Sequence, residues 1–187
     1  LNIFDPENHV LFFLGVHSGA RLVKQQQLGF EGQRPAELDE QAIVSCSRLG
    51  LDVLHLDLNQ HLDPFADGSY DCVVLSRTLQ AVLDVEGLLA EILRIGDRGI
   101  VSFPNFAYRK LRSMLAEEGR APESSGVLKH KWYDTPNLRF FSIADFLELC
   151  AERRFRVHRT IALDTEEGRE VTDDLNRNAD LAICIVS

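Results

Sequence analysis

A glycine-bracketed turn near the start of the chain is the first place where residue types and spacing could do chemistry. The apolar run Val10–Leu14 has the pattern of a buried strand, and Gly15 and Gly19 enclose the turn Val16-His17-Ser18. Good helix formers follow over residues 20–27. Strand, glycine turn and helix favour a ligand site, because glycine lets a ligand approach the backbone and a helix N-terminus offers unpaired N–H groups. An ordinary turn between a strand and a helix fits the two glycines about equally well.

Two carboxylates follow later strands of the predicted sheet. Glu37, with Leu38 beside it, comes at the end of the second strand, where a carboxylate can accept both hydroxyls of a ribose. Asp57 follows the third strand and could accept an adenine amine, with the N–H of Leu58 facing the ring. The alternatives are a solvated acid at a helix start for Glu37 and a turn aspartate for Asp57, and both remain open.

Ser76 stands at the end of the strand that we expect at the centre of the sheet, and Arg77 follows it. Sheet topology puts ligands at such strand ends, so Ser76 and Arg77 are candidate binding residues, although Arg77 could equally be a surface residue. His17 in the glycine turn is a weaker candidate for a general base. No histidine and carboxylate pattern in the sequence has the spacing of metal ligands.

Composition excludes several classes of protein. The 187 residues are 45% hydrophobic and 26% charged, as expected for one globular domain, and the net charge of −9 argues against a nucleic-acid partner. No apolar run approaches the roughly 20 residues that a membrane span needs, so we expect no membrane association. The four cysteines form no C-x-x-C pair, and no secretory leader is visible. We therefore expect reduced, buried thiols in a cytoplasmic protein.

Strands alternate with helices along most of the chain. We expect strands at 10–14, 33–38, 51–56, 70–76, 100–103, 155–163 and 181–186, and helices at 20–27, 40–49, 85–95 and 143–153. Asp84 and Ser142 are placed as N-caps of two of the helices. The predicted fold is an α/β, doubly wound seven-stranded sheet, mostly parallel with the last strand antiparallel, in a single domain over 1–187.

The segment from Tyr108 to Asn137 is basic at its start and too long for a simple connection in a compact domain. Trp132, Tyr133 and Asp134 combine two aromatic rings with an acid near its end. These residues predict either a pocket wall or an anchor that faces a partner. The alternative, a small satellite core at the open end of the sheet, is slightly favoured over both.

Several motifs resemble those of a known family. The order of elements resembles the class I S-adenosylmethionine-dependent methyltransferase fold, and the chain is more specifically similar to the MetW family of methionine-biosynthesis proteins. Three segments carry that resemblance: DGSYDCVVLSRTLQA at 67–81, IVSFPNF at 100–106 and KWYDTPN at 131–137. The last two are the most specific, because general methyltransferases of this fold lack them.

The resemblance implies an S-adenosylmethionine site and a partner. The implied binding residues are Gly15, Val16, His17, Gly19, Glu37, Leu38, Asp57, Leu58 and Ser76. The opening motif departs from the family, because Phe13 stands at its acidic position and His17 replaces a glycine, so we expect weak cofactor binding or none. The implied function is support of homoserine O-acetyltransferase, by docking that enzyme or through self-association. The alternatives are an active methyltransferase of unknown acceptor, or a relic of the fold that binds another nucleotide or nothing.

Overall fold

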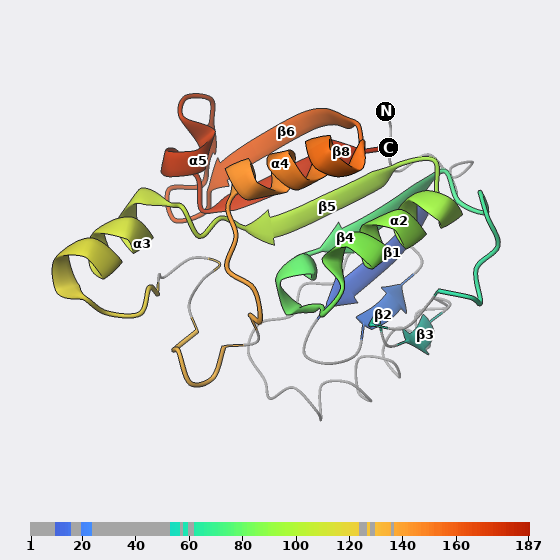
Figure 1. Cartoon of the computed structure of the whole chain (residues 1–187), viewed down its shortest axis with the longest axis horizontal. Helices are drawn as coiled ribbons and strands as arrows, with labels where there is room; N and C mark the ends of the chain where they lie inside the picture. Colours follow the sequence, from blue (N-terminus) through green and yellow to red (C-terminus); the bar gives the residue numbers. More distant parts are fainter. Residues whose placement is uncertain are drawn as a thin grey trace. The chain divides into compact units, whose positions relative to one another are not determined.

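The computed structural model describes residues 10–15, 20–23, 53–56, 58–59, 62–123, 127, 130–135 and 137–187. The chain divides into two compact units. The first comprises Leu1–Thr78 with Val82–Gly99, and the second comprises Leu79–Ala81 with Ile100–Ser187. Figure 1 labels helices and strands of the chain. No helix among the described residues is long and apolar enough to cross a membrane.

The strands of the first unit follow the order β3-β2-β1-β4. They are β1 Val10–Gly15, β2 Ala20–Val23, β3 Val53–Leu56 and β4 Cys72–Ser76. β1 runs parallel to β4, with Leu14 opposite Ser76. β2 runs antiparallel to both of its neighbours.

The predicted helix at 20–27 is wrong over its first residues. Ala20–Val23 forms β2, and Ala20 pairs with both Gly15 of β1 and Leu56 of β3. Helix propensities are worth only tenths of a kcal/mol per residue, so a ladder of hydrogen bonds to strands on both sides outweighs them. The predicted strand 33–38 and helix 40–49 lie outside the described residues.

The helix α2, Val85–Ile95, matches its prediction at both ends. The Asp84 carboxylate accepts a hydrogen bond from the Gly87 N–H at 2.9 Å, which satisfies one of the free amides of the first turn. The apolar residues that recur at helical spacing are buried: Leu88, Leu89, Ile92 and Ile95. Local signals therefore determined this helix and its predicted cap.

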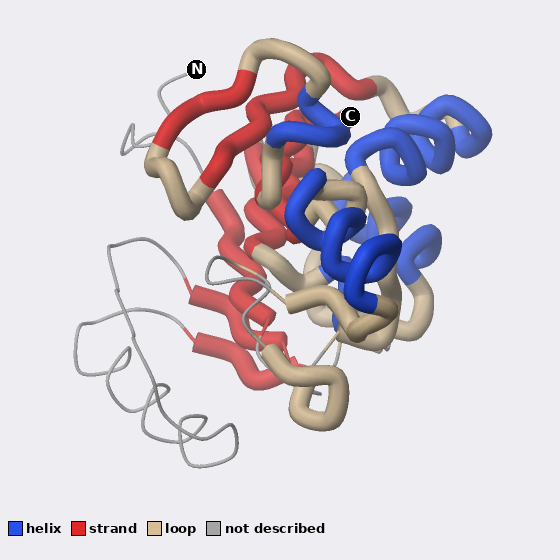
Figure 2. Tube along the Cα trace, turned by 90° about the vertical axis from the view of Figure 1, so that its left-hand side faces the viewer, coloured by secondary structure: helices blue, strands red, loops and turns tan. Residues whose placement is uncertain are grey.

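Strands of the second unit follow the order β5-β8-β6-β7. The strands are β5 Gly99–Pro104, β6 Val157–Asp164, β7 Arg169–Val171 and β8 Leu181–Val186. Between them lie η1 Leu79–Ala81, α3 Arg109–Ser113, the π-helical turn η2 Met114–Glu118, α4 Ile143–Arg153 and α5 Leu175–Asn178. Figure 2 shows the chain as a tube along the Cα trace, with helices in blue and strands in red.

The antiparallel pairing of the last two predicted strands is confirmed. β6 and β8 pair antiparallel over Val157–Leu163. The α/β class with a mixed sheet is also as predicted. The expectation that only the last strand runs antiparallel is wrong, because β2 pairs antiparallel with its neighbours and β7 pairs antiparallel with β6. β7 falls in a polar segment that we expected to be a loop, where a turn at Gly168, φ 66°, reverses the chain beside β6.

Packing of α4 over the strands forms the core of the second unit. Phe103 of β5 lies with its ring centroid 4.7 Å from that of Phe146 on α4. The predicted Ser142 cap forms a reciprocal capping box with Asp145.

Burial raises the pKa of the Cys150 and Cys184 thiols to about 11, so both remain protonated and unreactive near neutral pH.

Candidate functional site

The carboxyl ends of two parallel strands meet at the edge where we predicted a cofactor. Gly15 is the last residue of β1 and Ser76 the last of β4, and the register places them one step apart on neighbouring strands. Sheets of this kind bind ligands at such an edge. Gly15 and Ser76 are therefore brought together, whereas Leu58 is only 5% exposed and its side chain belongs to the core.

The other predicted cofactor residues lie outside the described part of the chain. These are Val16, His17, Gly19, Glu37, Leu38 and Asp57. The pairing of Gly15 with Ala20 shows, however, that the chain returns from the turn as a strand rather than a helix. The helix N-terminus that was expected to present amides to a ligand is thus absent from Ala20–Val23. Of the predicted set, the described residues place Gly15 and Ser76 at this edge, and the binding of an adenosyl group there stays a prediction.

Arg77 marks a sharp turn at the same edge. Its φ of 48° is unusual for a residue that carries a side chain. The Thr78 hydroxyl donates to the Ser76 carbonyl at 3.0 Å, which holds the end of β4 in place. Strained residues at strand ends occur where the chain must present a side chain in a particular direction.

A second candidate region lies in the second unit and centres on two exposed aromatic rings. Trp132 is 76% exposed and Tyr133 is 70% exposed, and their rings meet edge to face at 5.6 Å. The predicted satellite core at these residues is therefore wrong. A hollow of about 560 Å³ lies here, and we call its lining residues the Trp132 surface: Arg120, Ala121, Glu123, Lys131, Trp132 and Tyr133.

Charge accompanies the aromatic rings at the Trp132 surface. The Lys131 ammonium contacts the Glu123 carboxylate at 2.7 Å, across the hollow's lining. A turn in which the Asp134 N–H donates to the Lys131 carbonyl at 3.1 Å holds the two rings on its outside. The arrangement has the chemistry of a protein-binding patch, with apolar rings inside a charged border.

The backbone on either side of this surface is fixed by hydrogen bonds. The N–H groups of Leu138 and Arg139 both donate to the Gln80 carbonyl, at 2.8 and 3.0 Å. The Phe106 N–H donates to the Phe141 carbonyl at 3.2 Å. Phe140, 65% exposed, is thereby held with its ring 4.6 Å from that of Phe106.

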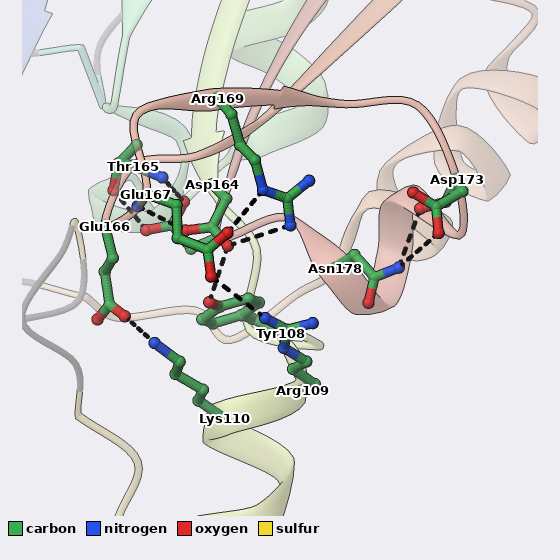
Figure 3. A network of polar contacts seen from close by, with 11 residues as sticks. Tyr108, Arg109, Lys110, Asp164, Thr165, Glu166, Glu167, Arg169, Asp173 and Asn178 are labelled. Atoms are coloured by element: carbon green, nitrogen blue, oxygen red, sulfur yellow. Dashed lines mark hydrogen bonds and ion pairs between the residues drawn. The ribbon is translucent and has the colours of Figure 1, made fainter.

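A polar network anchors the start of α3 (Figure 3). The buried Tyr108 hydroxyl donates to the Asp164 carboxylate at 3.2 Å, and burial together with the Asp164 charge raises the pKa of Tyr108. Lys110 pairs with Glu166, and Arg109 lies 3.7 Å from Glu167. The basic start of the segment is therefore held to the β6–β7 turn.

Asn105 has a structural role that was not predicted from the sequence. It is fully buried, and its amide donates to the carbonyls of Asn176 and Ala179 at 2.9 and 2.7 Å. Its oxygen accepts from the N–H groups of Ala107 and Ile143 at 3.2 and 3.3 Å. The one feature of the sequence that could have indicated this role is a polar residue between Pro104 and Phe106, at the end of an apolar strand.

The fold is that of S-adenosylmethionine-dependent methyltransferases. A Thermotoga maritima structure, described as a SAM-dependent methyltransferase and possible histamine N-methyltransferase, has a TM-score of 0.52 and 21% identity over 79% of this chain and 69% of its own. A SAM dependent methyltransferase from Aquifex aeolicus has a TM-score of 0.50 and 13% identity over 81% of this chain and 63% of its own. At these identities the likeness concerns the fold alone.

The chain belongs to the MetW family. The family model, described as methionine biosynthesis protein MetW, matches residues 5–186. A curated relative from Rhodopirellula baltica, the bifunctional methionine biosynthesis protein MetXA/MetW, is 39% identical over 149 residues. The match covers 79% of this chain and 24% of the relative, so the chain spans about a quarter of that protein's length. The resemblance drawn from the sequence is confirmed.

Proposed function

We propose that this chain supports homoserine O-acetyltransferase in methionine biosynthesis as a bound partner, without a methyl-transfer step of its own. The observation that carries the proposal is the relative in which MetXA and MetW form one bifunctional chain. Fusion keeps two proteins at equal numbers and at high effective concentration, which is useful where they must bind each other. The proposed setting is the cytoplasm, with both units acting as one methyltransferase-like domain.

Mixing the chain with the acetyltransferase of the same organism tests this function. We expect the two proteins to co-elute in gel filtration at micromolar concentration and the rate of homoserine acetylation to rise several-fold. Bovine serum albumin at the same concentration serves as the control for nonspecific protein effects. Separate elution together with an unchanged rate of acetylation would contradict the proposal.

We propose that an adenosyl ligand binds this chain weakly or not at all. The antiparallel pairing of β1 with β2 supports this, because Ala20–Val23 then forms a strand where the predicted site requires the start of a helix. S-adenosylmethionine would supply a methyl group if it were bound. Among the described residues, the ends of β1 and β4 at Gly15 and Ser76 are the part of the predicted site that could contact it.

Titration calorimetry with S-adenosylhomocysteine measures this binding. We expect a dissociation constant weaker than about 100 μM, equivalent to less than about 5.5 kcal/mol. Where heat is measurable, Glu37→Ala should weaken binding further, because Glu37 is the predicted ribose acceptor. Glu40→Ala, a change of a nearby acid, is the matched control. Binding near 1 μM would instead support the alternative, an active methyltransferase.

A further inference from the structure

The Trp132 surface has the features of a prepared docking site. Exposed aromatic rings are uncommon on a free surface, and Trp and Tyr are the residues in which interfaces concentrate their binding energy. Here the two rings stand beside a hollow of about 560 Å³. That space is large enough for a partner to insert an apolar side chain between the charged residues of the border.

Hydrogen bonds and ion pairs hold described residues near both ends of the segment that carries this surface. The Gln80 carbonyl receives two N–H groups from the chain just after the aromatic pair, at 2.8 and 3.0 Å. The Tyr108–Asp164 and Lys110–Glu166 contacts secure the start of the same segment. These contacts lower the conformational entropy that the residues they hold would lose when a partner binds, and pre-organisation of this kind strengthens binding.

The charge of the segment indicates a different protein rather than a second copy. Residues 108–139 contain seven Lys and Arg against four Asp and Glu, although the whole chain carries a net charge of −9. The lining of the Trp132 surface itself holds two cations, Arg120 and Lys131, against one anion, Glu123. A symmetric dimer through this surface would place two patches of net positive charge against each other, and like charges across an interface are unfavourable. A partner with an acidic border complements the segment instead.

We propose that the Trp132 surface docks the homoserine O-acetyltransferase partner, with an apolar side chain of that enzyme in the hollow and acidic groups facing Arg120 and Lys131. This inference rests on the proposed function. The choice of partner is supported by the Rhodopirellula baltica relative, in which MetXA and MetW form one chain. The positive charge of the segment also agrees with a partner other than a second copy of this chain.

Dissociation constants of the full chain for the acetyltransferase test the proposal. Trp132→Ala should raise the dissociation constant about 30-fold or more, as expected for a hot spot. Arg120→Glu should raise it about tenfold at low salt and less at high salt, because the contact is electrostatic. Leu147→Ala on α4, a change of a side chain that is 38% exposed, is the control and should leave binding within about twofold.

The outcomes separate this inference from the function on which it rests. If the parent chain does not bind the acetyltransferase, the proposed function fails and the docking surface with it. If the parent binds and both Trp132→Ala and Arg120→Glu bind equally well, only the assignment of the surface is overturned. A parent dimer that Trp132→Ala dissociates would also overturn it, in favour of a second copy. Melting temperatures of the variants should stay close to the parent's, since both side chains are exposed.

Discussion

Replacing Asn105 with alanine is expected to lower the free energy of unfolding by about 4 kcal/mol. The Asn105 side chain makes hydrogen bonds to four backbone groups, the carbonyls of Asn176 and Ala179 and the N–H groups of Ala107 and Ile143. Alanine would leave these groups without their partner in a site with no exposure to water. Each buried backbone group left unsatisfied costs about 1–3 kcal/mol, partly offset where water enters.

Urea denaturation followed by far-UV circular dichroism measures the effect. Asn178→Ala is the matched control, because the Asn178 amide donates to the carbonyl and the carboxylate of Asp173, at 3.1 and 3.2 Å, in hydrogen bonds that are exposed to solvent. We expect the control to lose less than about 1 kcal/mol. Equal losses for the two variants would mean that the buried hydrogen bonds of Asn105 are not formed in solution.

Phe103→Ala is expected to destabilise the second unit by a similar amount, about 3–5 kcal/mol. The ring is fully buried and packs against Phe146 and Phe141, with centroids 4.7 and 4.9 Å away. Truncation removes apolar area and leaves a cavity between β5 and α4, which the well-packed rings around it can fill only in part. Phe103→Leu keeps most of the volume and should lose about 1.5 kcal/mol or less.

The same denaturation experiment, with Phe146→Ala and the double variant, completes a mutant cycle. The two single losses should sum to more than the loss in the double variant, because each removes the same ring contact. Strict additivity would show that Phe103 and Phe146 contribute independently, against the packing seen in the structure.

The two family-specific motifs consequently have different roles. In IVSFPNF at 100–106, Phe103 and Asn105 are buried and hold α4 and α5 in the second unit, so this motif is structural. In KWYDTPN at 131–137, Trp132 and Tyr133 face solvent. Of the two motifs, only the second offers residues that a partner can reach.

Short-range signals in the sequence were sufficient for several elements. The bounds of α2 and α4 follow from apolar residues at helical spacing behind Asp84 and Ser142, and a helix cap is a contact between residues three positions apart. The antiparallel pairing of β6 with β8 follows from two apolar runs with no predicted helix between them, although β7 and α5 lie between these strands in the chain. The MetW family could be recognised in the same way, since its motifs are runs of neighbouring residues.

Burial and strand pairing were decided only by the tertiary structure. Phe103 and Trp132 are both aromatic residues in family motifs, yet one is in the core and the other in solvent, because burial depends on what distant segments pack against each ring. Asn105 gained its role from backbone groups more than 30 positions away, at Ile143, Asn176 and Ala179. Ala20–Val23 forms a strand because its backbone pairs with β1 on one side and β3 on the other. Local residue propensities do not include such pairing with distant segments.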